Sequence, residues 1–270
     1  MASSQFGNRA LGAARTLRGW VLAPPRWWCE LLVIAVIFGV YRWVQTIVRV
    51  DPGPAYARGR ALLDAQQAMH VDVEHPLNAF AVMHPAFAIF ANYYYVICHG
   101  GVTCAVLIWL FWWHGRRYPA ARLSLAVITV SAFVVFAVVP TAPPRLLSGA
   151  GFVDTLSQWH TIGGYQSGMM ARTADQFAAM PSLHIGWAVW ASLWLSRVVR
   201  RLWARVAAVA YPLVTSVVVL ATANHYILDI VGALVVVTAA ELAGAAVVHL
   251  PGHRAAPPSL TTPDARARAA

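Results

Sequence analysis

The residues of this sequence that are best suited to chemistry fall in three short stretches. The first, "PPRLL", contains Arg145, the second, "MPSLH", contains Ser182 and His184, and the third, "NHYILD", contains His225 and Asp229. Arginine presents a fork of donors that matches two phosphate oxygens. Histidine can give or take a proton near neutral pH. One Arg, two His and one Asp on a common face would suit phosphoryl transfer.

The third stretch carries the strongest local signal. His225 and Asp229 are four residues apart, so in a helix they share one face. Asp229 can then accept a hydrogen bond from one ring nitrogen, which leaves the other nitrogen basic, as in an activated nucleophile or base. Two alternatives stay open: a purely structural hydrogen bond, or a metal site completed by His160, His75 or Asp154.

The second stretch predicts a helix start. Ser182 is a good N-cap, and Pro181 prevents an earlier start, so the free N–H groups of the first turn would favour an anion. His184 lies in that turn. Asn224 is expected to cap a helix near 227 in the same way, giving a second such terminus. The alternatives are that His184 is only an interfacial polar residue and that Arg145 is only a headgroup anchor.

The composition predicts an all-α integral membrane protein. Of 270 residues, 59% are hydrophobic and only 11% are charged, and a soluble protein with one large core is the less favoured alternative. Six apolar runs approach the length of about 20 residues that crosses a bilayer. They are 30–48, 94–113, 122–140, 183–198, 203–222 and 227–249.

The remaining segments complete the predicted organisation. The stretch 77–92, interrupted by Pro85, is expected to be interfacial, with a seventh span as the alternative. We predict a flexible cytoplasmic segment over 1–27, a six-span catalytic domain over 28–250 and a flexible cytoplasmic tail over 251–270.

The arginines predict the orientation. All twenty basic residues are arginine, and fourteen of them fall on one side of a six-span arrangement. The positive-inside rule places that side, and both termini, in the cytoplasm of a plasma (inner) membrane protein. The chemical stretches then share the extracytoplasmic face. The net charge of +10 favours contact with anionic headgroups, and no nucleic-acid partner is expected.

Two charged residues, Arg42 and Glu241, fall inside predicted spans. A charge at the centre of a membrane helix costs about 2.5–3.5 kcal/mol on insertion scales. We therefore expect both to face the helix bundle, where they pair with each other or line a polar cavity.

The order of these residues resembles a known family. Arg145, then P-S-L-H (181–184), then H-x-x-x-D (225–229) is similar to the type-2 phosphatidic acid phosphatase superfamily, which includes membrane lipid phosphatases, phosphotransferases and soluble vanadium haloperoxidases. The variants "PPR", "AMPSLH" and "NHYILD", with "NYYYVICH" (92–99), look most like its inositol-phosphorylceramide synthase branch. That branch moves a phosphoinositol headgroup between lipids. The resemblance covers about 55–245.

The resemblance implies a role for each residue. His225 would attack phosphorus and carry a phosphohistidine, and Asp229 would orient it. His184 would protonate the leaving oxygen and then activate the acceptor. Arg145, and the backbone around Ser182, would hold the phosphoryl oxygens. The family requires no metal and no other cofactor.

The sequence departs from the superfamily pattern at three places. Val138 stands where a lysine is usual, Leu146 replaces a proline, and 218–219 is Val-Val in place of Ser-Arg. Two expected cations are therefore missing, and Arg172 is the predicted phosphate-binding replacement. Weaker candidates are Arg58, Arg60 and His99.

The function expected from the sequence is transfer of a phosphate-bearing headgroup, such as phosphoinositol, from a phospholipid to a lipid or alcohol acceptor. A phosphatase acting on lipid phosphate or polyprenyl (di)phosphate is the nearest alternative. A non-catalytic lipid-binding or transport protein is the alternative of a different class. The sequence leaves the oligomeric state open.

Overall fold

The regular structure of the described residues is helical. The computed structural model describes residues 19, 26–47, 51–161 and 176–249. The helices are α2 (Trp27–Ile47), α3 (Pro52–Ala68), α4 (Glu74–Met83), α5 (Pro85–Trp113), α6 (Tyr118–Val138), η1 (Pro144–Leu146), α7 (Thr155–Gln158), α9 (Leu183–Val198), α10 (Leu202–Ala221) and α11 (Ile227–His249). The predicted Arg172, and most of the two predicted tails, lie outside the described residues.

The prediction of an all-helical integral membrane protein is confirmed. Within the described part of the chain, α2, α5, α6, α10 and α11 are long and apolar enough to cross a membrane. The remaining predicted span, 183–198, forms α9, which has 16 residues. Its length of about 24 Å falls short of a hydrocarbon core of about 30 Å.

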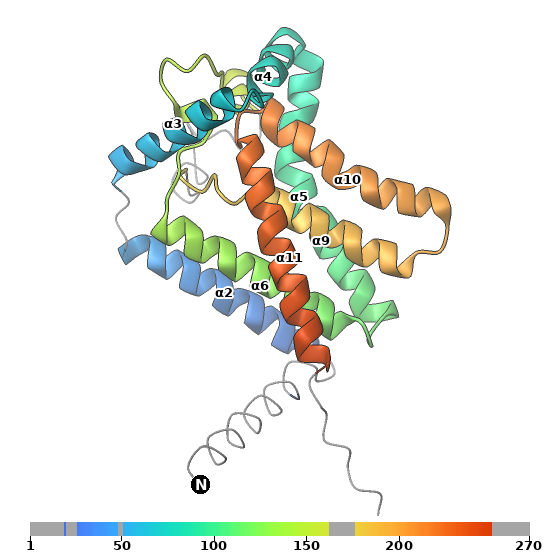
Figure 1. Ribbon diagram of the computed structural model, residues 1–270. Coiled ribbons are helices and arrows are strands. Elements are labelled where there is room, and N and C mark those ends of the chain that lie inside the picture. The colour runs from blue at the N-terminus through green and yellow to red at the C-terminus, as the bar shows by residue number, and fades with distance from the viewer. Residues whose placement is uncertain (1–18, 20–25, 48–50, 162–175, 250–270) are drawn as a thin grey trace, which may run out of the picture.

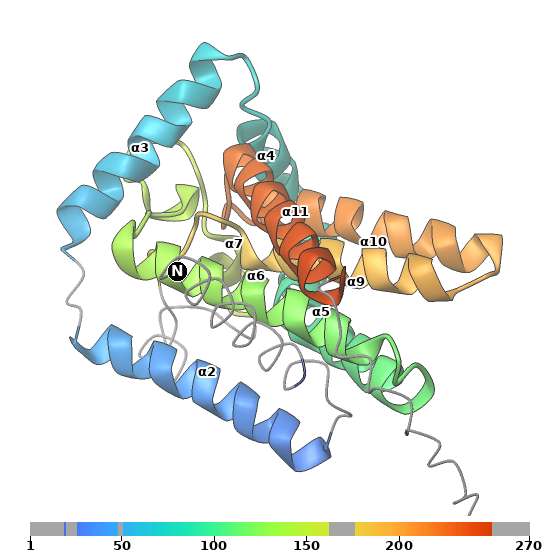
Figure 2. The same cartoon turned by 60° about the horizontal axis from the view of Figure 1, so that its bottom comes forward.

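The short helix α9 is the centre of the bundle. It contacts α5, α6, α10 and α11, whereas α2 lies at the edge beside α6 (Figures 1 and 2). The helices α3 and α4 lie at one end of the bundle, where α3 contacts α11 and α4 contacts α10 (Figure 1). Because α9 is enclosed by other helices, its first residues have a fixed position relative to the start of α11.

Indole donors hold α9 against α6. The Trp190 Nε1–H donates to Ser124 Oγ at 3.1 Å, and the Trp187 Nε1–H donates to Thr129 Oγ1 at 3.0 Å. Gly186 allows the close approach, because a Cβ there would lie 3.1 Å from a methyl carbon of Ile128. Satisfying these polar groups inside the bundle sets the height of α9 along α6.

The proline at 85 separates two helices and begins the second one. Helix α4 ends at Met83, and Pro85 is the first residue of α5, where its missing N–H is harmless. The predicted segment 77–92 is therefore divided between two helices, since its second half begins the 29-residue α5.

The two charges predicted inside spans take different positions. Glu241 pairs with Arg197 of α9 at 2.7 Å and lines a cavity between helices. Arg42 is exposed on α2, so the expectation that it faces the bundle is wrong. The physical reason is that α2 lies at the edge of the bundle, with its candidate span unburied by other helices.

Candidate active site

The three chemical stretches meet in space. The Arg145 Nε–H donates to Asn224 Oδ1 at 2.8 Å, which ties η1 to the turn between α10 and α11. The Ser182 backbone N–H donates to the Asp229 carbonyl at 3.2 Å, which ties the start of α9 to the start of α11. These contacts place all the predicted residues of the three stretches around His225.

The hydrogen bonds of His225 determine its tautomer. Its Nδ1 lies 2.9 Å from the Ala179 carbonyl oxygen and 3.2 Å from Asp229 Oδ2. Both partners are acceptors, so Nδ1 carries the proton and Nε2 keeps a free lone pair. His225 is 3% exposed and Asp229 is 0% exposed, so little water competes for these bonds.

Side chains from three elements cap the start of α11. Asp229 Oδ2 accepts from the Tyr226 backbone N–H at 2.8 Å, the acidic half of a capping box. Glu74 of α4 accepts from the Ile227 N–H. Gln66 of α3 accepts from the next backbone N–H of α11 at 3.0 Å. The first amides of this helix are therefore already satisfied.

Two predictions about this helix start are wrong. Asn224 does not cap α11: its amide donates to Thr222, and its oxygen accepts from Arg145. The start of α11 is also not a second anion site, because Asp229, Glu74 and Gln66 occupy its N–H groups. A cap contributed by another part of the chain leaves no nearby sequence signal.

The start of α9 has the cap and the free amides on which the predicted anion site depends. Ser182 is the N-cap and its Oγ accepts from the Ile185 N–H at 3.4 Å. The backbone N–H groups of Leu183 and His184 have no acceptor among the described residues. Two free amides at the positive end of a helix form a site for phosphoryl oxygens.

Aromatic rings pack on both sides of His184. Its ring centroid lies 4.1 Å from Tyr95 and 4.0 Å from His99, and His99 stacks on Trp187 at 4.2 Å. The His184 and His225 centroids are 5.7 Å apart, close enough for both rings to reach one phosphoryl group. His99, predicted only as a weak phosphate-binding candidate, instead supports the face of His184.

Arg145 is held on two sides. Its side chain is 3% exposed, its Nε–H donates to Asn224, and its Nη1 lies 3.7 Å from Asp154 Oδ2. Asp154 also caps α7 by accepting from Leu156 and Ser157. These contacts fix the guanidinium beside the turn that carries His225.

Arg58 and Arg60, two of the weaker phosphate-binding candidates, bind backbone carbonyls from α3. Arg58 donates to the Pro140 carbonyl at 2.8 Å, and Arg60 donates to the Ser148 carbonyl at 2.8 Å. Both therefore fasten α3 to the loop before and after η1. Arg172, the preferred candidate, lies outside the described residues.

The residues of the metal alternative have other partners. His75 contacts Asp72 and the Ala150 carbonyl, each at 2.6 Å, and Asp154 contacts Arg145. Within the described ranges, no three His, Cys, Asp or Glu side chains gather as metal ligands would.

Sequence reasoning missed the support that α3 and α4 give to the site. The Tyr226 hydroxyl donates to the Ala142 carbonyl at 2.9 Å, and a Cβ on Gly59 would lie 2.5 Å from that carbonyl oxygen. Burial raises the pKa of both Tyr226 and Glu74. These contacts leave no local signal in the sequence, because the partners are 84 or more residues apart.

A family model matches more than half of the chain. Residues 60–243 match the family model described as the PAP2 superfamily. The matched region begins in α3 and includes all three chemical stretches. No curated protein and no solved structure matches the chain.

Proposed function

Because this chain belongs to the PAP2 superfamily, which includes lipid phosphatases and phosphotransferases, we propose that it transfers a phosphate-bearing headgroup from a phospholipid to a lipid or alcohol acceptor. The chain is an integral membrane enzyme of that superfamily. The finer assignment, transfer of a phosphoinositol headgroup, is supported by the similarity of "NYYYVICH" and "AMPSLH" to the inositol-phosphorylceramide synthase branch.

The observation that carries the proposal is the pair of acceptors at His225 Nδ1. With its proton held there, Nε2 can attack phosphorus. An N–P bond forms while the bond from phosphorus to the donor lipid oxygen breaks, and His184 gives its proton to that oxygen. The acceptor hydroxyl then loses its proton to His184 and attacks phosphorus, and the N–P bond breaks. Asp229 offsets the positive charge that His225 acquires.

Fixed donors would stabilise the charge that spreads over the phosphoryl oxygens. The Arg145 guanidinium and the free amides of Leu183 and His184 come from different elements. We propose Arg172 as a further cation, in place of those missing at Val138 and Val219. The excess of arginine on the other loops supports an extracytoplasmic site in a plasma (inner) membrane protein.

The test uses purified full-length protein in detergent with phosphatidylinositol, phosphatidic acid or polyprenyl phosphate. Release of headgroup or phosphate is followed with and without diacylglycerol or ceramide. His225→Ala is compared with His84→Ala, a matched change at an exposed histidine. Acid-labile, alkali-stable labelling from a ³²P-labelled donor would identify the phosphohistidine.

Each outcome separates the alternatives. Release that depends on the acceptor and disappears only in His225→Ala supports the transferase. Free phosphate without an acceptor makes the enzyme a lipid phosphatase. If His225→Ala and His84→Ala act alike on every lipid, His225 is not the nucleophile and a non-catalytic lipid-binding role is favoured.

A further inference from the structure

A strongly cationic cavity lies at the end of the bundle away from His225. It has a volume of about 570 Å³ and lies between the loop that joins α5 to α6 and the loop that joins α9 to α10. The arginines that line it are Arg116, Arg117, Arg197, Arg200 and Arg205. Its walls bring these charges together from two segments about 80 residues apart.

The described acidic residues nearby pair with only one of these five arginines. Glu30 pairs with Arg122, and Glu241 pairs with Arg197. Arg117 donates to the carbonyl of Arg197 at 2.8 Å, which leaves its charge uncompensated. Among the described residues, no carboxylate pairs with the other lining arginines. The cavity therefore favours an anion.

The helix ends at these loops do not account for the positive potential. Helices α6 and α10 begin where α5 and α9 end, so positive and negative ends of helix dipoles lie together. The charge of the cavity therefore comes from its arginine side chains.

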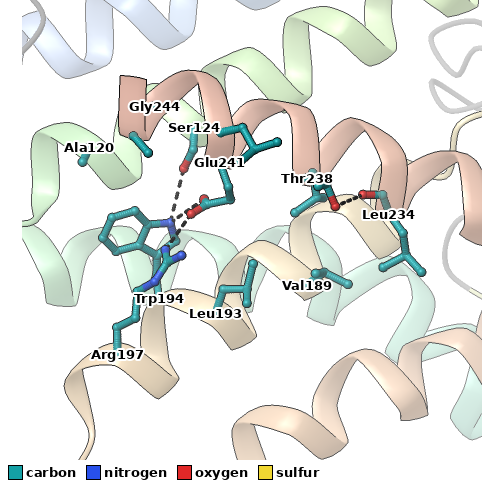
Figure 3. Close-up of a pocket in the computed structure, with 13 residues that line it drawn as sticks. Ala120, Ser124, Val189, Leu193, Trp194, Arg197, Leu234, Thr238, Glu241 and Gly244 are labelled. Carbon is teal, nitrogen blue, oxygen red and sulfur yellow. Dashed lines mark hydrogen bonds and ion pairs between the residues drawn. The ribbon is translucent and has the colours of Figure 1, made fainter. Parts of the chain in front are cut away.

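An apolar groove continues from the cationic cavity. It has a volume of about 680 Å³, lies between α6, α9 and α11, and shares Arg197 with the first cavity (Figure 3). Its lining is mostly aliphatic and includes Leu193, Leu234, Val237 and Leu242.

Arg197 is fixed at the boundary between the two cavities. Its Nη1 lies 2.7 Å from Glu241 Oε2, and its guanidinium carbon lies 4.6 Å from the Trp194 ring centroid. The Trp194 Nε1–H in turn donates to Glu241 Oε1 at 3.1 Å (Figure 3). A charged group beside an aliphatic groove matches a phospholipid, in which a polar headgroup adjoins apolar acyl chains.

We propose that this pair of cavities binds one anionic phospholipid, with its phosphate among the arginines and an acyl chain in the groove between α6, α9 and α11. The lipid belongs to the leaflet opposite the catalytic site. The exposed Trp113 and Trp203 beside the loops are typical of residues at a membrane interface. Basic pockets between membrane helices on the cytoplasmic side suit anionic headgroups.

The chain's own terminal segments do not fit this site. Residues 1–26 contain four arginines and no acidic residue, and 251–270 contain three arginines and one aspartate. Their charge is the same sign as that of the cavity. The bound lipid is also not the substrate, because α11 begins at Ile227, next to His225, and Glu241 lies fourteen residues further, about 21 Å along the helix.

The test is native mass spectrometry of the full-length protein in a mild neutral detergent, titrated with phosphatidylglycerol or phosphatidylcholine. Arg200→Gln removes a lining charge, and Arg201→Gln removes the adjacent arginine, which does not line the cavity. We expect the Kd for phosphatidylglycerol to rise about five-fold in Arg200→Gln. In Arg201→Gln we expect the Kd to change by less than about two-fold. Binding at the catalytic site is common to both variants and cancels in the ratio.

A second pair of variants tests the groove. Gly244→Leu places a side chain where the groove has open space, and Gly39→Leu makes the same change on α2. We expect only Gly244→Leu to weaken lipid binding, while both keep the turnover of the parent. A hundred-fold excess of glycerol phosphate is expected not to displace the lipid.

Three results would contradict the proposed lipid site. Equal weakening in Arg200→Gln and Arg201→Gln would show general surface attraction and no built site. Displacement by glycerol phosphate, or unchanged binding in Gly244→Leu, would show that no acyl chain occupies the groove. These ratios do not depend on turnover, so a failure of the proposed enzymatic function would leave them interpretable.

Discussion

Replacing Asp229 by asparagine tests how the proton of His225 is held. The Asp229 Oδ2 accepts from the Tyr226 N–H at 2.8 Å and from His225 Nδ1 at 3.2 Å. An asparagine oxygen in the same place can accept both bonds. The Ala179 carbonyl, 2.9 Å from Nδ1, independently requires a proton on that nitrogen. Asp229→Asn should therefore keep the tautomer and lose only the negative charge.

The size of the loss follows from that charge. A hydrogen bond to a charged group contributes about 1.5–3 kcal/mol and a neutral one about 0.5–1.5 kcal/mol. The difference of about 1–1.5 kcal/mol corresponds to about ten-fold in kcat/KM. An enzyme whose aspartate alone fixes the histidine tautomer loses about 10⁴-fold on the same change.

Asp229→Asn should have a small effect on stability, and Asp229→Ala a large one. In Asp229→Asn the new amide group occupies the position of Oδ1, which has no partner among the described residues, but a buried charge is also removed. In Asp229→Ala the Tyr226 N–H loses its acceptor, which costs about 1–3 kcal/mol. We therefore expect a clearly lower Tm only for Asp229→Ala.

The assay measures initial rates of headgroup or phosphate release, with Tm for each variant in the same detergent. A loss of 10³-fold or more in a folded Asp229→Asn protein would refute the role given to Ala179. An unchanged rate would refute the role given to the charge of Asp229.

Three further changes test the support of the site. Gly59→Ala should lower the free energy of unfolding by about 1–3 kcal/mol, because its Cβ would lie 2.5 Å from the Ala142 carbonyl oxygen; thermal unfolding checks this against Gly39→Ala, and equal Tm values would contradict it. Burial raises the pKa of the Glu74 carboxyl. The contribution of protonated Glu74 to the free energy of unfolding is therefore complete below about pH 4.5 and is lost as pH rises through the raised pKa. Glu74→Gln, which still accepts from the start of α11, should flatten that decline in Tm, and an unchanged decline would assign it to another group. Arg145→Lys keeps the charge but loses the fork, so kcat/KM should fall about 10–100-fold, whereas full activity would mean that the charge alone suffices.

The helices that cross the membrane could be predicted because their signal is local. A run such as 203–222 is apolar over its whole length, and the structure forms α10 at Leu202–Ala221. The bounds of α9 were predicted in the same way, as 183–198, but its central position in the bundle could not be. A buried membrane helix and a lipid-facing one have similar composition, so which helix is enclosed depends on how the others pack.

In the candidate site, too, local interactions could be predicted from the sequence and long-range ones could not. The sequence by itself determined Ser182 as the cap of α9 and the pairing of His225 with Asp229, because each interaction closes within one helical turn. Only the tertiary structure decided that Glu74 caps α11 and that His99 stacks on His184. Those partners are far apart in the chain and meet only after the bundle has packed, and a single sequence records which residues are present but not which distant ones touch.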